Sequence, residues 1–409
     1  MSSRTRRTLG KRQGRAVVAA VALGVTAPLL ASTPAAADPP GDPLKPVVFN
    51  DPRYPEARDD VQDHLIGLIR GARPGSTIRL STFLFRDRTV AKELAEAADE
   101  GVTVKVLADS GTLRKAPEIF VGLRDKLTAE GRGSWAKLCE KGCLGSKGSP
   151  ALHSKFALFS NTFDETDVSF VTTSNLTTKK TGGVGGTKGW NSGYTAVGNK
   201  GLHKRLKGYF DVLKKDKPID DYYNKNRPRT TGNVKTYFHP RNDGNDTIAN
   251  ILKGVTCRKD GRRTKVRVSN WWVAREKAAW QLRALALNGC SVDVVANQVS
   301  SQACRLLTLP VPFKKDVRLQ GFSRGARETG NHQKHIMIDG TYLGKKQKVT
   351  VTGSENFTPS SLEENDELLA RVGGSKVHDA FVGNFKKVKK DADVKYDASD
   401  LCKKLKPVK

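Results

Sequence analysis

The sequence is short of acidic residues, and beyond its N-terminal region it lacks any apolar run long enough to cross a membrane. Its 42 Asp and Glu residues are outnumbered by 71 Lys and Arg residues, giving a formal net charge of +29 over 409 residues. This excess attracts polyanions such as nucleic acid, anionic lipid surfaces or acidic wall polymers, but it says nothing about the fold. Lysine-rich tracts near 204–217, 386–395 and 403–409 are also explained as solvated helix faces, so charge alone selects no substrate.

The N-terminal apolar run, from Ala16 to about Ala31, is too short and too rich in alanine to be a good membrane span. Six basic residues precede it, and the small-residue cleavage site Ala35–Ala37 follows it. This order predicts a secretory signal peptide at 1–37, with an uncleaved anchor as the alternative. We therefore expect a mature monomer that begins near Asp38, carries a charge of +23 (29 − 6), and is secreted to the extracellular space.

The chain also lacks a recognisable metal-binding pattern, although it has six cysteines. Cys139 and Cys143 have the spacing C-x3-C, but no second pair of Cys or His residues lies beside them. An even number of cysteines in an exported chain favours disulfides, and these two are close enough to close a small loop. The other four, which leave three pairings open, are Cys257, Cys290, Cys304 and Cys402.

One order of elements occurs twice along the chain. Each half has an apolar-periodic helix, an alternating strand, a helix that ends at a glycine, a β-branched strand and a closing amphipathic helix. The expected ranges are 58–72, 76–85, 88–101, 102–107 and 202–215 in the first half, and 244–254, 264–273, 275–289, 291–295 and 377–390 in the second. The repeated strand, helix and strand have lengths typical of right-handed βαβ crossovers.

This duplication predicts an α/β fold with two units, each built on a mostly parallel sheet. The halves are expected at 38–217 and 235–409, joined by a linker at 218–234 that contains Pro, Asn and Gly. The first half is longer between its second strand and its histidine motif. That insertion contains Cys139 and Cys143, so we expect a disulfide-tied loop at the rim of the site.

Each half carries a His-x-Lys pattern, followed some twenty residues later by a hydroxyl residue and an asparagine. The two sets are His153, Lys155, Thr173 and Asn175, and His332, Lys334, Ser354 and Asn356. Both patterns lie in strand-like sequence, where residues i and i+2 point to the same face. If the halves pack about a pseudo-twofold axis, these faces meet in one cleft.

Two imidazoles, two ammonium groups, two hydroxyls and two amides in one cleft are suited to a phosphodiester substrate. One imidazole can attack phosphorus to form a phosphohistidine, while the other protonates the departing alkoxide and later deprotonates water. The lysines and asparagines can offset the charge that grows on the phosphoryl oxygens, a role that metal ions have elsewhere. We therefore expect a phosphoric diester hydrolase that needs neither cofactor nor metal.

The two copies resemble the signature of the phospholipase D superfamily, H-x-K-x4-D followed by G-[ST]-x-N. The second copy matches fully, with Asp339 and Gly353 at the remaining positions, whereas the first copy departs at Ser160 and Thr172. The resemblance covers both halves, and it implies two pseudo-symmetric α/β/α sandwich halves of the phospholipase D type with one shared active site.

Superfamily members also carry an acidic residue in an N-x-[ED] segment, which orients a histidine. Asn365–Glu367 fits this segment, but the matching place in the first half, Asn191–Gly193, has no carboxylate. In two-copy relatives the first histidine is generally taken as the nucleophile, which implies His153. Glu367 instead predicts that His332 is the better-oriented and more basic imidazole, so both assignments stay open. A decayed first site, with a core histidine and a surface lysine, is a further alternative.

Three functions are compatible with these features. The first is a secreted phospholipase D that hydrolyses or transphosphatidylates phospholipids such as phosphatidylcholine and contacts anionic membrane surfaces peripherally. The second is a secreted, metal-independent nuclease of the same superfamily, favoured by the positive charge. The third is a catalytically weakened binder of anionic surfaces. The glycine run 182–186 lacks the setting and the G-K-[ST] end of a phosphate loop, so we expect a mobile loop near the cleft.

Overall fold

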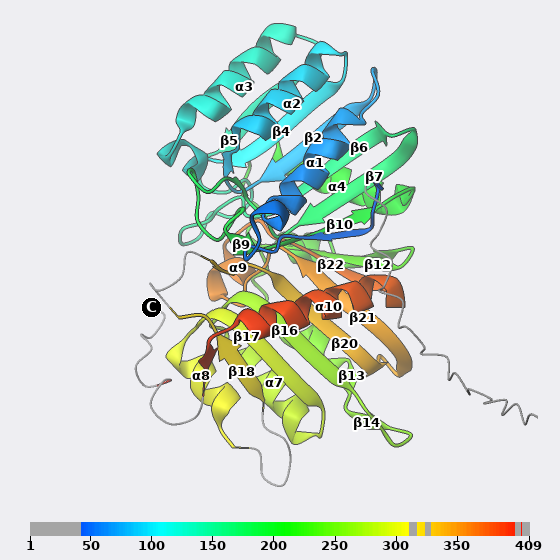
Figure 1. Cartoon of the computed structure of the whole chain (residues 1–409), viewed down its shortest axis with the longest axis vertical. Helices are drawn as coiled ribbons and strands as arrows, with labels where there is room; N and C mark the ends of the chain where they lie inside the picture. The colour runs from blue at the N-terminus through cyan, green and yellow to red at the C-terminus, as the bar shows by residue number, and fades with distance from the viewer. Residues whose placement is uncertain (1–41, 311–316, 324–328, 397–401, 403–409) are drawn as a thin grey trace, which may run out of the picture. The chain divides into compact units, whose positions relative to one another are not determined.

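Two β-sheets, one from each half of the sequence, form the frame of the molecule (Figure 1). In this computed structural model the described residues are 42–310, 317–323, 329–396 and Cys402. All of them from Pro43 onward belong to one compact unit. The expected signal peptide at 1–37 and the lysine-rich tract at 403–409 lie outside the described residues.

The first sheet has seven strands in the order β1-β10-β7-β6-β2-β4-β5. The strands of this half are β1 (Val47–Phe49), β2 (Thr77–Thr82), β3 (Phe85–Arg86), β4 (Thr103–Asp109), β5 (Trp135–Cys139), β6 (Phe156–Thr162), β7 (Glu165–Thr172), β8 (Leu176–Thr177), β9 (Gly189–Trp190) and β10 (Ser192–Ala196). Its helices are α1 (Asp60–Arg70), α2 (Arg88–Asp99), α3 (Pro117–Glu130) and α4 (Lys200–Leu213), with single 3-10 turns at Pro55–Ala57 and Ser110–Arg114.

The second sheet has the order β11-β12-β22-β21-β20-β16-β17-β18-β23, with β13 paired to β20. The strands are β11 (Arg229–Thr231), β12 (Val234–Phe238), β13 (Val255–Thr256), β14 (Arg258–Lys259), β15 (Arg262–Arg263), β16 (Lys265–Val273), β17 (Ser291–Val299), β18 (Arg318–Gly321), β19 (Gly330–Asn331), β20 (Lys334–Tyr342), β21 (Lys345–Gly353), β22 (Leu368–Gly373) and β23 (Val394–Lys395). The helices are α5 (Tyr222–Lys225), α6 (Thr247–Lys253), α7 (Glu276–Leu287), α8 (Ser301–Thr308), α9 (Pro359–Glu363) and α10 (Ser375–Asp391).

Both sheets are mixed, so the expectation of mostly parallel sheets is wrong. Within the two large sheets, the parallel pairs among the described strands are β2–β4 and β4–β5 in the first half and β16–β17 and β17–β18 in the second, and the other pairs are antiparallel. The physical reason is the short connection after each His-x-Lys motif. A few residues join β6 to β7 and β20 to β21, and such tight links allow only antiparallel pairing.

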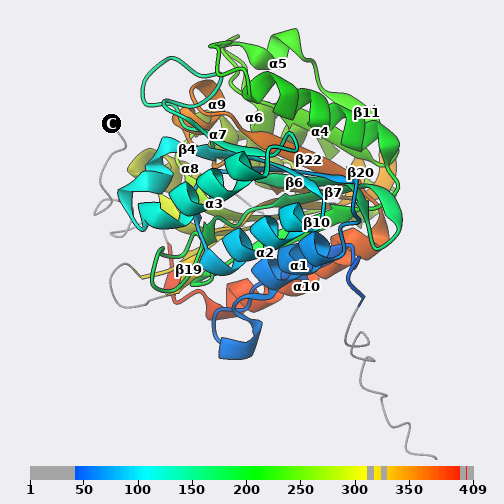
Figure 2. The same cartoon turned by 90° about the horizontal axis from the view of Figure 1, so that it is seen from above.

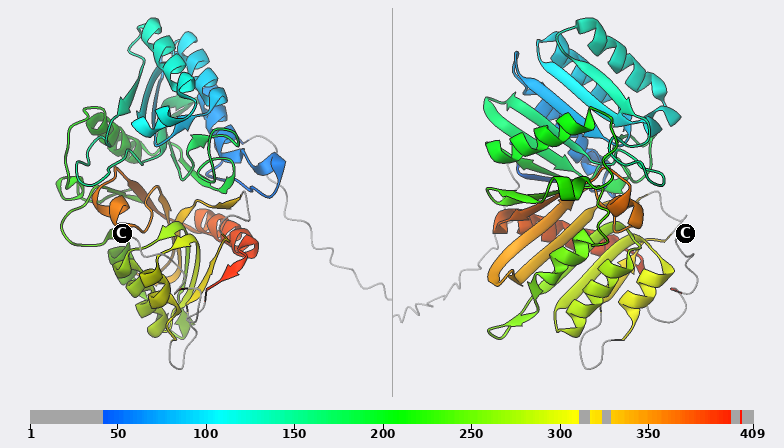
Figure 3. Two further views of the ribbon diagram at one scale, coloured as in Figure 1. Left: turned by 90° about the vertical axis from the view of Figure 1, so that its left-hand side faces the viewer. Right: turned by 180° about the vertical axis from the view of Figure 1, so that it is seen from behind.

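The elements stack in layers because each sheet buries apolar side chains on both of its faces. Helices α1, α2 and α3 cover the outer face of the first sheet, where they lie side by side (Figure 2), and α6, α7 and α8 cover the outer face of the second. The green α4 and the red α10 lie between the sheets, in one apolar cluster that contains residues of both halves (Figure 3). Each half therefore has an α/β/α order.

The helices form where the repeat predicts them, and their ends follow local signals. Asp87 caps α2 by accepting the backbone N–H groups of Thr89 and Val90, and Asn199 caps α4 by accepting that of Leu202. Gly101 follows α2 with a φ of +91°, a conformation that favours glycine. The segment expected to be a linker, 218–234, contains α5 and β11, and β11 pairs with β12.

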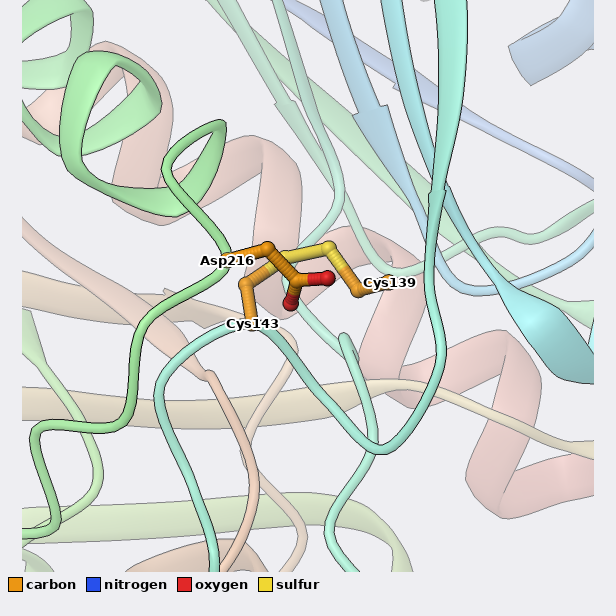
Figure 4. A group of neighbouring side chains, drawn as sticks. All are labelled: Cys139, Cys143 and Asp216. Atoms are coloured by element: carbon orange, nitrogen blue, oxygen red, sulfur yellow. A yellow bond between two sulfur atoms is a disulfide. The ribbon is translucent and has the colours of Figure 1, made fainter.

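Three disulfides join the six cysteines: Cys139–Cys143, Cys257–Cys290 and Cys304–Cys402. The first confirms the expected small loop, and the other two select one of the three open pairings. The only group of potential metal ligands among the described residues is Cys139, Cys143 and Asp216, which point toward one another (Figure 4). Both sulfur atoms are used in the disulfide, so this group does not form a metal site.

No helix in the described part of the chain has the length and apolar character needed to span a membrane.

Candidate active site

The two His-x-Lys motifs occupy corresponding places just before the central antiparallel strand of each sheet. His153 and Lys155 precede β6, and His332 precedes β20, whose first residue is Lys334. Each histidine is fixed by the backbone of the opposite half. The N–H of His153 donates to the carbonyl of Asp366 at 3.1 Å, and that of His332 donates to the carbonyl of Trp190 at 3.0 Å. The motifs therefore belong to one site built across the two halves.

The two lysines of the motifs are buried, and each ammonium group turns back on its own histidine. Nζ of Lys155 donates to the carbonyl of His153, and Nζ of Lys334 donates to that of His332, both at 2.5 Å. Each lysine is 1% exposed. Burial lowers the pKa of Lys155 to about 7, and burial together with the charge of Lys155 lowers the pKa of Lys334 well below its usual value. The first motif has therefore not decayed to a surface lysine.

Glu367 orients His153, not His332 as its position after the second motif had predicted. Nδ1 of His153 donates to Oε1 of Glu367 at 2.8 Å, and the hydroxyl of Ser354 donates to the other carboxylate oxygen. Burial would raise the pKa of Glu367, but the imidazole of His153, the charge of Lys155 and the hydroxyl of Ser354 hold that pKa at about 2. Glu367 is therefore an ionised partner that fixes the proton of His153 on Nδ1 and leaves Nε2 free to react.

His332 has an amide partner instead of a carboxylate. Its Nδ1 donates to Oδ1 of Asn191 at 3.0 Å, and the hydroxyl of Thr173 donates to the same oxygen at 2.9 Å. Asn191 precedes β10 just as Glu367 precedes β22. The structural counterpart of Glu367 is thus Asn191. The sequence comparison had matched Glu367 with Gly193, two positions later. Sequence reasoning identified the segment 191–193 as the counterpart of 365–367 but missed the role of Asn191 within it.

The orientation of Asn191 is fixed by a glycine-rich loop. Its Nδ2 donates to the carbonyls of Val184, Gly186 and Gly189 at 2.9–3.3 Å, so Oδ1 must face His332. A Cβ atom on Gly185 would lie 3.5 Å from Nε2 of His332 and 2.6 Å from Nδ2 of Asn175. The run 182–186 therefore does lie beside the site, and the lack of a side chain at Gly185 leaves room for both groups.

Electrostatics keep both imidazoles neutral near pH 7. Burial lowers the pKa of His153 to about 4, although Glu367 acts in the opposite direction. Burial and the charges of Lys334 and Lys155 lower the pKa of His332 well below its usual value, with no carboxylate to oppose them. The free site therefore has too little negative charge to hold either imidazole protonated. A phosphate that enters the site would raise the pKa of both histidines by favouring their protonated forms.

The two asparagines of the motifs each have a buried side-chain oxygen, and Asn175 lies beside His332. Oδ1 of Asn175 and Oδ1 of Asn356 are buried without a hydrogen-bond partner in the described part of the chain. The hydroxyls of Thr173 and Ser354, by contrast, are engaged with Asn191 and Glu367 and position these groups. The contacts thus join eight of the ten expected residues in one site, with the hydroxyls in supporting positions.

Asp339 is a further expected residue, and the structure does not bring it to the site. It lies five residues beyond Lys334 along β20, where it lines a surface pocket with residues such as Lys265 and Lys346. Along a strand this separation is about 17 Å. Its counterpart Ser160 instead accepts the N–H of Thr77 at 2.8 Å.

An aromatic ring flanks each histidine at equivalent places after β2 and within β16. The ring centroid of Phe83 lies 5.1 Å from that of His153, and the centroid of Trp271 lies 5.5 Å from that of His332. Sequence reasoning missed Phe83, because a strand-end phenylalanine also fits a core position. Each motif histidine therefore has one aromatic neighbour.

A family model described as "Cardiolipin synthase, PLD-like domain" matches residues 65–185 and 262–389, which include both His-x-Lys motifs. The chain belongs to this family of PLD-like domains. The match covers both halves, as expected from the duplicated motif. No curated protein sequence matches the chain.

Solved structures of low sequence identity share the fold of this PLD-like chain. Polyphosphate kinase from Porphyromonas gingivalis is 14% identical with a TM-score of 0.60, and the alignment covers 86% of this chain and 48% of that chain. The chain therefore spans about half the length of the kinase. Phosphatidylserine synthase from Haemophilus influenzae is 11% identical with a TM-score of 0.53, and the alignment covers 86% of this chain and 89% of that chain.

Proposed function

We propose that this protein is a secreted phosphodiesterase that cleaves phospholipids by the phospholipase D reaction, through a phosphohistidine. The observation that carries the proposal is the crossed pairing of His153 with Glu367 and of His332 with Asn191, beside two buried lysines. In the proposed reaction both imidazoles act on one phosphorus atom, and their different partners support different roles. The basic N-terminal region and the apolar run after it support secretion.

His153 is the nucleophile in this proposal. Its Nε2 forms a bond to phosphorus while the bond from phosphorus to the alcohol oxygen breaks, and the imidazole gains positive charge. Ionised Glu367 stabilises that charge through Nδ1. Lys155 and Lys334 offset the negative charge on the phosphoryl oxygens in the same step.

His332 is the proton donor and acceptor. Its imidazolium transfers a proton from Nε2 to the departing alkoxide, and the neutral ring then takes a proton from water, which attacks phosphorus and breaks the P–N bond. Asn191 is neutral and cannot stabilise the imidazolium as a carboxylate would. His332 therefore releases its proton readily, which is what the leaving alkoxide requires.

A direct test uses a chromogenic phosphodiester whose nitrophenolate leaves without protonation. We expect His332→Ala to form the labelled phosphohistidine and to hydrolyse it slowly, so that label accumulates on His153. His153→Ala should remain unlabelled. Label on residue 332 in the wild-type protein would reverse the assignment.

Nucleic acid is the second candidate substrate, favoured by the net charge of the chain. Phosphatidylcholine vesicles and plasmid DNA, each incubated with the protein in EDTA, separate the two. Choline release without nicking of DNA supports the phospholipase, and nicking without choline release supports the nuclease. Loss of both activities in EDTA would contradict the metal-free chemistry.

A further inference from the structure

A pocket of about 750 Å³ opens beside His153, at the carboxyl ends of the parallel strands of the first sheet. Its wall is formed by residues that follow β2, β4 and β5 and by the segment 148–151, which leads directly into the first motif. Ligands of α/β proteins bind at this edge of a parallel sheet because the loops there converge.

The pocket adjoins the catalytic groups through Phe83 and Asp109, which line it. The centroid of the Phe83 ring lies 5.1 Å from that of His153 and 5.5 Å from Nζ of Lys155. Asp109 accepts the N–H of Leu152, the residue before His153, at 3.0 Å. A substrate with its phosphorus at His153 therefore has this pocket next to it.

The pocket contains a buried guanidinium that forms no ion pair with any described residue. Arg86 is 8% exposed, and its Nε and Nη2 donate only to the carbonyls of Thr112 and Gly111. Burial lowers the pKa of Arg86, and the charge of Arg114 lowers it further. The buried charge of Arg86 thus lies near a second guanidinium, and a bound anion would offset the cost of that burial.

The other charged groups of the pocket reinforce this field. Four basic and two acidic side chains line it, a balance of +2 (4 − 2). The exposed basic side chains, which make no ion pair with a described residue, are Arg114, Lys115 and Lys141. The buried acid, Asp109, is already engaged by the N–H groups of Gly111 and Leu152. Guanidinium groups match phosphate oxygens in geometry and charge.

We propose that this pocket binds a second phosphate group of the substrate, linked to the phosphodiester that is cleaved. The inference rests on the proposed phosphodiesterase function and narrows its substrate class. A positively charged pocket repels the trimethylammonium of choline, and a guanidinium does not stabilise a bound acyl chain. The preferred substrate therefore carries phosphate on the group next to the scissile bond.

Matched substrates that differ by one phosphate test the proposal. They also distinguish a lipid from a nucleic acid as the source of the second phosphate. The lipid pair is phosphatidylglycerol and phosphatidylglycerophosphate; the nucleotide pair is the dinucleotide TpT and its 5′-phosphorylated form. We expect the phosphorylated member of one pair to have the higher kcat/KM. In Arg114→Gln this preference should fall about tenfold, since one charge-assisted contact is lost. Arg124→Gln, which removes an exposed arginine outside the pocket, should retain it.

Equal preference in the wild type and in Arg114→Gln would overturn the inference while leaving the phosphodiesterase intact. If the wild type cleaves none of the four compounds and releases no choline from phosphatidylcholine, the proposed function fails, and phosphate binding then decides the inference alone. Equilibrium dialysis with labelled inorganic phosphate should give two sites per wild-type chain and one in Arg114→Gln. The same stoichiometry in both proteins would contradict a second phosphate site.

Discussion

At the scale of single residues, the lysines of the site are the clearest case of function opposing stability. Lys155 and Lys334 are each 1% exposed, and the charge of Lys155 disfavours the charge of Lys334. Burying ammonium groups costs free energy that a bound phosphate would offset. The free protein therefore carries strain at this site that its substrate relieves.

Lys334→Met should make the protein more stable and inactive. We expect the free energy of unfolding to rise by about 1 kcal/mol, because a buried ammonium is replaced by an apolar chain of similar length. Phosphodiester hydrolysis should fall about a hundredfold or more. Urea unfolding and a chromogenic assay measure the two effects. Lys348→Met, which breaks an exposed pair with Asp379, is the control and should gain no stability. A destabilised Lys334→Met protein would contradict the prediction.

The lowered pKa of Lys155 predicts that phosphate binding takes up protons. The pKa is about 7 in the folded protein and near its usual 10.5 in the unfolded chain. The folded state binds fewer protons between these values, so this group's contribution to stability is present above pH 10.5 and is lost as the pH falls through 7. Phosphate favours the charged amine, so its affinity should fall as the pH rises above 7.

Calorimetric titration of phosphate at pH 8, in two buffers with different ionisation enthalpies, measures this uptake. Lys155→Arg keeps its charge at every pH used, so proton uptake should be smaller by up to one proton. An uptake equal to that of the wild type would show that Lys155 is already charged in the free site.

At the scale of elements, the disulfide loop after β5 holds the backbone beside His153 and Glu367. The N–H groups of Cys143, Leu144 and Gly145 donate to the carboxylate of Asp366, which is fully buried next to Glu367. Asp366 in turn exchanges backbone hydrogen bonds with Ala151 and His153. The loop thus fixes the backbone on both sides of the His153–Glu367 contact.

Replacing Cys139 and Cys143 by serine should therefore lower kcat by more than the loss of stability alone would explain. Loss of so short a loop costs about 2 kcal/mol of unfolding free energy by the chain-entropy relation. The matched control is Cys257→Ser with Cys290→Ser, whose longer loop costs about 4 kcal/mol by the same relation but lies away from the site. If kcat follows stability in both double variants, the loop has no positioning role.

The glycine-rich loop offers a second test at this scale. A Cβ atom at position 185 would lie 2.6 Å from Nδ2 of Asn175, so Gly185→Ala must displace that amide. We expect a lower kcat with little change in thermal unfolding. Gly183→Ala, where a Cβ atom meets no neighbour, is the control and should behave as the wild type. Equal kcat in both variants would place Asn175 outside the reaction.

At the scale of the whole molecule, neither half contains a complete site. His153 takes its carboxylate from the second half, and His332 takes its amide from the first. The halves also share the apolar cluster between the sheets. Residues 38–217 and 218–409, produced separately, should each be inactive against a chromogenic phosphodiester and should recover activity on mixing. Activity in the second fragment alone, which has the fuller motif, would contradict the shared site.

The fold was largely predictable because its elements are encoded locally. Apolar periodicity and glycine positions identified helices such as α2 and α7 within a few residues, and the duplication predicted two α/β halves. Strand direction was not predictable in the same way. The parallel crossovers were recognised, but the hairpins after His153 and His332 make most neighbouring strands antiparallel.

The sequence by itself determined which groups could form a site: two His-x-Lys motifs, each followed by a hydroxyl residue and an asparagine. It misplaced Asp339, because a matching motif position does not specify where its side chain lies. Only the tertiary structure decided which group orients which histidine. Glu367 follows the second motif yet binds His153 from 214 positions away, and Asn191 binds His332 across 141. Such contacts depend on how the two halves pack together, and no local pattern of residues encodes that register.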